Sequence, residues 1–301
     1  MSSNIYTHQD ENIWKTWGLM ALFFSIIMAF GWFFSYLYGN TVILYVAFTF
    51  AIIMNIFSYW FSDKIVLKLH GAKPATRDQY FDLWNAVENL SITAGLPMPG
   101  LFVIDDPVPN AFATGRNKEH AVICVTIGLL TTLNKNELEG VIAHELSHIG
   151  NRDILLSTVM VVMAGFVTML SDLFLRSQRW GSNRNRDNNG GAILLIIGLI
   201  LAILTPVTAT LIRLAISRKR EFLADASGAL LTRYPEGLAS ALKKISAPSL
   251  PMRLANNATA HLFITNPFNV KSTIGLHKLF MTHPPVEERI RALIGTSYGP
   301  R

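Results

Sequence analysis

Two histidines separated by three residues form the part of this chain best suited to chemistry. The segment His144-Glu145-Leu146-Ser147-His148 places two imidazoles four positions apart. On a helix these positions lie on one face, so both rings can bind the same metal ion, and the Glu145 carboxylate projects towards the same cleft. This pattern on a helix is typical of zinc peptidases, with two histidine ligands and a glutamate as general base. The alternative is a pair of structural or surface histidines.

The residues before this motif predict the helix that it requires. Asn134 is a good N-cap residue, and Glu137 follows at the capping-box spacing. Gly140 is a poor helix former, which suggests close packing at that position. Three aliphatic residues recur at intervals compatible with one buried stripe, namely Leu138, Ile142 and Ile149.

A catalytic zinc site needs a third protein ligand, with water in the fourth position. Glu221 and Asp225 stand four positions apart, on one face of an expected helix. Glu221 can bind the metal, and Asp225 can accept a hydrogen bond from a ligating imidazole and fix its tautomer. Alternatively, Glu221 is a solvated member of the mixed-charge run that begins at Arg218. The other histidines lack ligand spacing and are expected to be structural or solvated: His8, His70, His120, His261 and His277.

Long apolar segments predict a membrane protein. Hydrophobic residues make up 50% of the chain and charged residues 15%, whereas soluble domains carry about 25% charged residues. No charged residue occurs from Trp17 to Ser62, and that stretch is about twice as long as one membrane helix requires. It must therefore turn, and the expected place is Tyr38-Gly39-Asn40-Thr41. Two membrane helices are predicted, at 17–37 and 41–61.

A second apolar pair is expected at 154–171 and 192–212, joined by a polar, glycine- and asparagine-rich loop at 176–191. Lysines and arginines follow the second and fourth apolar segments, so the positive-inside rule places both flanks in the cytoplasm. The arginines of the loop disagree, because four complete spans would export it. Either the rule is broken there, or the third and fourth segments lie against the domain without fully crossing.

Each apolar hairpin returns the chain to the side that it left. The segments on both sides of the second pair therefore share one compartment, and Glu221 can meet His144 and His148. The expected organisation has four parts: an N-terminal transmembrane hairpin (1–62), a first catalytic part with the motif helix (63–153), the second apolar pair (154–212), and a second catalytic part with the third ligand (213–301).

Charge and cysteine usage narrow the class of partner. The net charge of +6 suits attraction to anionic lipid, so a bilayer is an expected partner. The basic residues cluster at the ends of apolar segments, and no nucleic acid is expected. The single cysteine, Cys124, has no partner for a disulfide and fits a reducing cytoplasm. A simpler interpretation is a small buried residue in the strand-like run 121–126.

Together the motifs resemble the HtpX family of membrane zinc metallopeptidases, which is related to the CAAX prenyl protease and to mitochondrial inner-membrane quality-control peptidases. The matching residues extend from about 14 to 290, nearly the whole chain. The resemblance implies a mainly α, multi-span helical membrane protein with four candidate transmembrane helices and an α+β zincin-like catalytic domain. The resemblance rests on His144–His148 followed by Asn151 and Asp153, on Arg220–Asp225, on Pro109–Gly115 and on Thr282–Ile290.

The resemblance also implies roles for individual residues. One zinc ion per chain is expected on His144, His148 and Glu221, with Glu145 as general base. Asn110, His283 and Arg289 are candidates for stabilising the oxyanion or positioning substrate. The alternatives are that His283 caps the helix that follows it, and that Arg289 pairs with a carboxylate. The stretch 110–115 is expected to be an edge strand that pairs with extended substrate.

The expected function is that of an integral-membrane zinc endopeptidase in the bacterial inner membrane, with its active site on the cytoplasmic side. Its expected substrates are damaged, misassembled or unfolded membrane polypeptides, in a stress response. Two alternatives are an inactive metal-binding membrane scaffold and a protease that processes lipidated C-termini. The sequence assigns no function to residues 231–280 and no oligomeric state.

Overall fold

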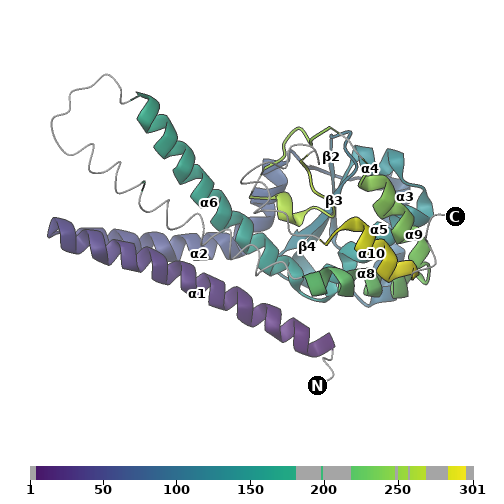
Figure 1. Cartoon of the computed structure of the whole chain (residues 1–301). Coiled ribbons are helices and arrows are strands. Elements are labelled where there is room, and N and C mark those ends of the chain that lie inside the picture. The colour runs from purple at the N-terminus through teal and green to yellow at the C-terminus, as the bar shows by residue number, and fades with distance from the viewer. Residues whose placement is uncertain are drawn as a thin grey trace.

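Two long antiparallel helices project from an α/β domain in the computed structural model of the chain (Figure 1). The structure describes residues 5–180, 198, 218–247, 250–256, 258–268 and 284–295. The two helices are α1 (Ile5–Tyr38) and α2 (Val42–Leu69), and they are joined at Gly39, whose φ of 61° suits glycine. The predicted turn is thus confirmed.

Both helices are long and apolar enough to cross a membrane, over Asn12–Tyr38 and Val42–Leu69. Most of their apolar side chains face outward: only 22% and 11% of the residues in their most apolar windows are buried. An apolar surface of this extent requires lipid or another partner to cover it. Both helices extend beyond the predicted spans, because a helix does not end where polar residues begin.

The third apolar segment lies within α6 (Asp153–Trp180), a helix that follows α5 (Lys135–Gly150) after a bend of 85°. By length and composition, α5 and the Asp153–Val167 part of α6 pass together as a candidate bent membrane span. The start of the expected polar loop was wrong, since 176–180 continue α6. Arg176 and Gln178 are good helix formers, and polarity alone does not end a helix. The fourth segment lies outside the described residues apart from Gly198.

A small mixed sheet supports the domain. Its strands are β1 (Lys73–Pro74), β2 (Gly100–Ile104), β3 (Ala111–Gly115) and β4 (Ala121–Thr126), in the order β1-β2-β4-β3. Strand β4 pairs parallel to β2 and antiparallel to β3. β3 is therefore an edge strand, as predicted. Cys124 is fully buried on β4.

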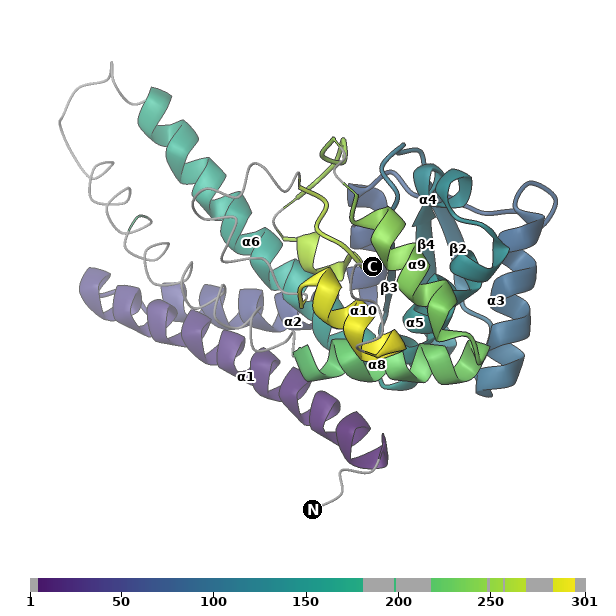
Figure 2. The ribbon, with the colours of Figure 1, turned by 45° about the vertical axis from the view of Figure 1, so that its right-hand side comes forward.

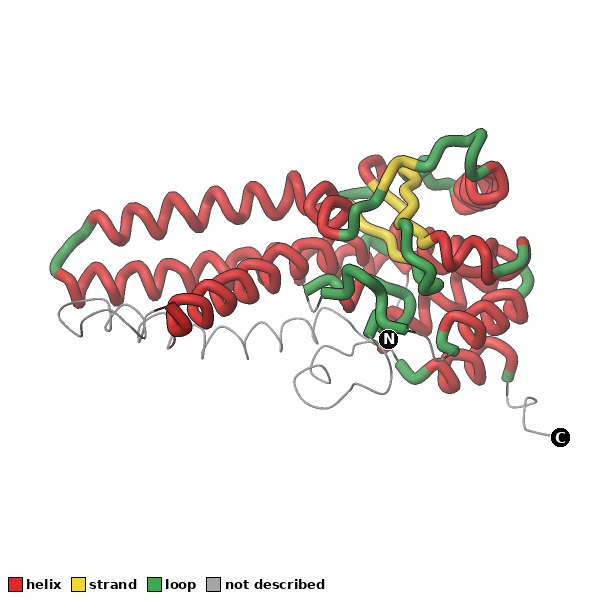
Figure 3. The backbone as a smooth tube through the Cα atoms, turned by 90° about the horizontal axis from the view of Figure 1, so that it is seen from above, coloured by secondary structure: helices red, strands yellow, loops and turns green. Residues whose placement is uncertain are grey.

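Helices surround α5 on several sides (Figure 2). The connecting helices are α3 (Phe81–Ala94), α4 (Ile127–Thr132), α8 (Arg218–Thr232), α9 (Pro235–Ile245) and α10 (Val286–Ile294), with the short turns η1 (Lys118–His120) and η3 (Ala260–Leu262). Seen from above, the helical hairpin extends to one side of this domain (Figure 3).

The sequence of α5 explains its central position. Asn134 accepts a hydrogen bond from the Glu137 N–H at 3.0 Å, and the Asn134 N–H donates to the Glu137 carboxylate at 2.9 Å, which completes the predicted capping box. A Cβ at Gly140 would lie 2.7 Å from the Leu238 nitrogen, so glycine allows α9 to approach closely. The three predicted stripe residues, Leu138, Ile142 and Ile149, are all buried.

Helix α8 approaches α5 at the motif itself. A Cβ at Gly228 would lie 3.0 Å from the His144 nitrogen, tighter than most real contacts. The small residue on α8 thus allows its backbone to lie against the metal-binding turn of α5. Because Asp225 and Glu221 stand one and two turns before Gly228, the same packing brings both carboxylates to His144.

Candidate metal centre

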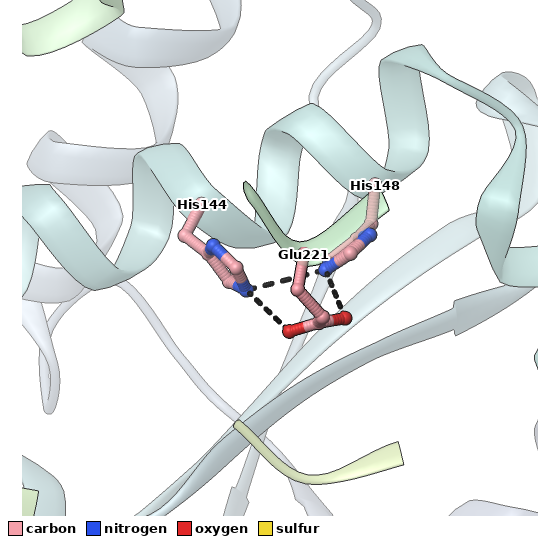
Figure 4. A group of neighbouring side chains, drawn as sticks. All are labelled: His144, His148 and Glu221. Carbon is pink, nitrogen blue, oxygen red and sulfur yellow. Dashed lines mark hydrogen bonds and ion pairs between the residues drawn. The ribbon is translucent and has the colours of Figure 1, made fainter. Parts of the chain in front are cut away.

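Three side chains from two helices converge on one point. The histidines of α5 turn their Nε2 atoms towards the Glu221 carboxylate of α8 (Figure 4). The two Nε2 atoms are 3.2 Å apart, and the Glu221 oxygens lie 3.9 Å from that of His144 and 3.6 Å from that of His148. One ligand atom from each residue falls within 4.8 Å of the others, so the group can hold a metal ion.

A carboxylate on the far side of each ring fixes its orientation. His144 Nδ1 lies 3.0 Å from Asp225 Oδ1, and His148 Nδ1 lies 3.0 Å from Asp153 Oδ2. With both Nδ1–H groups donating to carboxylates, each neutral imidazole directs its Nε2 lone pair at the shared point. Two nitrogens and a carboxylate facing one point repel each other unless a cation lies among them. Their nitrogen and oxygen chemistry fits zinc.

The two imidazoles differ in their electrostatic surroundings. Burial lowers the pKa of His144 to about 4, assisted by the charge of Arg289 against the opposing bond to Asp225. Burial also lowers the pKa of His148, but the surrounding carboxylates of Asp153, Glu221 and Glu145 outweigh it and raise the pKa to about 9. A proton on His148 thus takes the place of a cation at the site. The surroundings favour positive charge there.

Arg289 is fully buried and lies against His144, with its Nη2 3.4 Å from His144 Nε2 and 3.5 Å from His144 Nδ1. Its Nε and Nη2 donate to the two Asp225 oxygens at 2.8 and 2.7 Å, and its Nη1 donates to the Ile264 carbonyl at 3.2 Å. Burial opposes ionisation of Asp225, but the bonds from Arg289 and His144 lower its pKa to about 2. Arg289 Nη1 also lies 3.8 Å from Glu221. The guanidinium therefore holds the carboxylate that orients His144.

Glu145 lines a small cavity beside the ligands. The cavity has a volume of about 40 Å³, enough for a water molecule or two. Its wall combines residues from five elements: Ala113, Glu145, His148, Asp153, Ile154, Ser157, Arg220, Glu221, His261 and Leu262. A carboxylate, two ligands and space for water thus meet in one place.

Asn110 and Arg289, two of the residues expected to contact substrate or the oxyanion, lie outside the cavity wall in the part of the chain that the structure describes. Asn110 is fully buried; its amide donates to the Thr265 carbonyl at 3.0 Å, and its Oδ1 accepts from Thr265 N–H at 3.3 Å. His283 lies outside the described residues.

Two residues of the site carried little signal in the sequence. Asp153 bonds His148 from beyond the end of α5; the resemblance included this residue directly after the motif but gave it no role. His261 forms part of the cavity wall, with its Nε2 donating to the Ser157 carbonyl at 3.0 Å. Its isolated position in the sequence gave no sign of that location.

The fold and site define a membrane metallopeptidase: two candidate membrane helices, a small mixed sheet and a His-Glu-x-x-His helix with a distant glutamate. Residues 79–297 match peptidase family M48. The chain belongs to this family and, within it, to the HtpX proteases. It is 50% identical to a protease HtpX homolog of Caldanaerobacter subterraneus subsp. tengcongensis over 295 residues, 96% of this chain and 97% of that protein.

Other similar proteins agree with this assignment. A protease HtpX homolog of Pyrococcus furiosus is 47% identical over 285 residues, 93% of this chain and 95% of the relative. The crystal structure of S. mikatae Ste24p superposes with a TM-score of 0.50 at 19% identity, covering 96% of this chain and 67% of that chain, which supports the fold. The chain is thus a metal-dependent protease with membrane helices.

Proposed function

We propose that the chain is a zinc endopeptidase that cleaves membrane-attached polypeptides at the cytoplasmic surface of the bacterial inner membrane. The observation that carries the proposal is the convergence of two carboxylate-oriented Nε2 atoms and a buried glutamate beside a water-sized cavity. One zinc per chain on His144, His148 and Glu221 would supply Lewis-acid polarisation of the scissile carbonyl and a more acidic bound water.

Glu145 is the proposed general base. It follows the first ligand and lines the cavity, so its carboxylate can take a proton from an attacking water and deliver it to the leaving amine. Asp225 and Asp153 keep the two ligating rings in one tautomer throughout. Asn110 and His283 remain candidates for positioning substrate. Arg289 acts in this proposal through Asp225.

The outer edge of β3 is buried, but it meets the cavity at Ala113 and is the proposed place for extended substrate. Thr126 N–H donates to the Asn110 carbonyl across the β3–β4 pair, so the alternate residues 111, 113 and 115 direct their backbone groups outward. Ile264 N–H already occupies the Ala111 carbonyl. Ala113 lines the cavity beside Glu145. Pairing with the Ala113 backbone would lay a peptide across the site with little preference for its sequence.

Aromatic residues indicate where the bilayer lies. Near the domain, Trp17 stacks on Tyr59 with centroids 6.1 Å apart, and at the far end Tyr36 is 79% exposed. Trp and Tyr favour membrane interfaces, and the 17–36 interval on α1 spans about 28 Å, close to the roughly 30 Å hydrocarbon core. Asn12 lies about 8 Å before Trp17 on α1 and contacts Asp153, which bonds the ligand His148. The proposed zinc site is therefore close to the membrane surface.

The basic residues that follow the second predicted span support a cytoplasmic position for the domain by the positive-inside rule. A site near the bilayer surface favours polypeptides that are themselves held there, including misfolded membrane proteins. We extend the proposal to four spans, with α6 and the segment 192–212 as the second pair, and to the four-part organisation at 1–62, 63–153, 154–212 and 213–301.

The test compares Glu145→Gln with Glu139→Gln, a half-buried glutamate of the same helix that lies outside the cavity wall. With purified protein in detergent, we expect Glu145→Gln to retain zinc and to lose cleavage of an unfolded protein by about 10²–10⁴-fold, while Glu139→Gln cleaves normally. Equal cleavage by both variants contradicts the mechanism. Zinc binding without cleavage in the wild type identifies a metal-binding scaffold.

The substrate class has its own test. We expect a membrane-anchored polypeptide to be cleaved faster than its detached soluble loop when both are presented with the protein in liposomes. Comparable rates for the two substrates would argue against selection by the membrane surface.

A further inference from the structure

Asn12 is a buried polar residue on a helix that mostly faces outward. It is only 3% exposed, whereas Trp14, two positions later, is 77% exposed. Burying an amide is unfavourable unless its hydrogen bonds are made within the protein. The partners of Asn12 therefore indicate what this part of α1 contributes to the domain.

Every polar atom of the Asn12 side chain is used. Its Nδ2 donates to Asp153 Oδ1 at 2.6 Å and to the Asn151 carbonyl at 3.2 Å, and its Oδ1 accepts from Arg220 Nη1 at 2.8 Å. The reverse amide orientation would set a carbonyl oxygen against two acceptors and an NH₂ group against a guanidinium. One orientation alone satisfies all three partners.

These partners lead directly to the metal ligands. Asp153 shares its two oxygens between Asn12 and His148, so the amide fixes the carboxylate that orients the ring. Arg220 precedes Glu221 on α8, and its Nε lies 3.8 Å from Asp153. Asn12 thus joins α1 to both elements that support the His148 side of the site.

We propose that Asn12 is a positioning residue of the metal centre, which makes the first membrane helix a component of the active site as well as an anchor. This inference rests on the proposed zinc-peptidase function. Of the partners that the structure describes, loss of the amide leaves Asp153 Oδ1 with the more distant Arg220, so the carboxylate can rotate and His148 loses its fixed orientation. A displacement of α1 in the bilayer would act on the ligand in the same way.

The experiment measures zinc affinity and ligand geometry in the full-length protein in detergent. Asn12→Ala removes the amide, and Asn12→Asp keeps its size and its acceptor for Arg220 while removing the donor to Asp153. Thr16→Val is the matched control, because Thr16 is equally buried one turn later and bonds only the Asn12 carbonyl of its own helix. The readouts are the zinc dissociation constant, the visible spectrum of the cobalt-substituted protein, and kcat and KM.

We expect both Asn12 variants to bind zinc about tenfold more weakly, the lower end of the range for residues that support metal ligands. The cobalt spectrum should change, and kcat should fall with KM within about twofold, since Asn12 touches no substrate. Thr16→Val should match the wild type. In an Asp153→Asn background, Asn12→Ala should have little further effect, because the two residues act through one bond.

Unchanged zinc affinity and cobalt spectrum in both variants, even with a lower thermal midpoint, would overturn the inference and leave Asn12 as a packing contact. Full additivity with Asp153→Asn would overturn it as well. If the wild type binds zinc but cleaves no polypeptide, the proposed function fails, while the zinc affinities of the variants still decide the role of Asn12.

Discussion

Replacing Arg289 by methionine separates two roles for this residue. The resemblance to known peptidases suggests contact with substrate, whereas the structure places the guanidinium against His144, with bonds of 2.8 and 2.7 Å to Asp225. Arg289→Met keeps most of the side-chain volume and removes the charge. Asp225, 1% exposed, then keeps His144 as its only ionisable partner among the described residues.

The expected loss of stability follows from this burial. Removing one member of a buried ion pair costs about 3–5 kcal/mol, because the remaining charge stays desolvated without its partner. For a chain of this size that corresponds to a thermal midpoint lower by roughly 10 °C. The pKa of His144 should rise when the nearby positive charge is lost. A proton then competes with zinc, and misorientation of the ring adds to this, so zinc should bind about 10–100-fold more weakly.

The assay combines thermal unfolding in zinc and in chelator, a zinc dissociation constant from competition with a chromophoric chelator, and cleavage of an unfolded protein. Arg291→Met is the control, since Arg291 is an exposed arginine on the same helix, α10. If Arg289→Met retains the wild-type zinc affinity and thermal midpoint but loses cleavage, the positioning role is refuted. Arg289 would then act on substrate.

Gly140→Ala should lower the free energy of unfolding, because overpacking against Leu238 costs about 1–3 kcal/mol and outweighs a gain in helix propensity of about 1 kcal/mol. Gly165→Ala is the control, since a Cβ there meets no atom within 4 Å and should not destabilise the protein. Thermal unfolding of the two variants measures the difference. In metal-free protein the raised pKa of His148 means that folding takes up a proton between pH 6.5 and 9. The contribution of protonated His148 to the free energy of unfolding is complete below pH 6.5 and is lost as the pH rises to 9, at about 1.4 kcal/mol per pH unit. Denaturant titrations across this pH range test whether stability falls as the pH rises. Zinc must displace the same proton, so its affinity should rise by up to about tenfold per pH unit; an affinity independent of pH would contradict this. Glu221→Gln should weaken zinc binding by more than about 100-fold, measured as metal retained after dialysis.

Local signals allowed much of the fold to be predicted. The capping box at Asn134 and Glu137 and the turn at Gly39 each depend on residues close together in the sequence, whereas the edge strand at Ala111–Gly115 was expected from the resemblance. The metal-binding trio needed one long-range step, from α5 to Glu221. That step depended on the resemblance to the HtpX family, because spacing alone left Glu221 as either a ligand or a solvated residue.

The sequence suggested that Asp225 supports an imidazole and that Arg289 can pair with a carboxylate, but it could not specify which distant residues meet. Asn12 and Asp153 are 141 positions apart, and Asp225 and Arg289 are 64 apart. No periodicity or spacing connects such pairs, because the contact exists only after the helices have packed. In the sequence Asn12 is one polar residue before an apolar run, and nothing distinguishes it from a solvated amide. Its role depends on the angle at which α1 meets the bend between α5 and α6.

The two ligating histidines consequently have unequal supports. His144 is held by Asp225 and Arg289, all buried and all drawn from helices of the domain. His148 is held by Asp153, whose other oxygen bonds Asn12 of the membrane helix, and its side chain is 15% exposed in the cavity. The His144 side gives the site a rigid reference, and the His148 side is the one through which the membrane hairpin reaches the metal ligands.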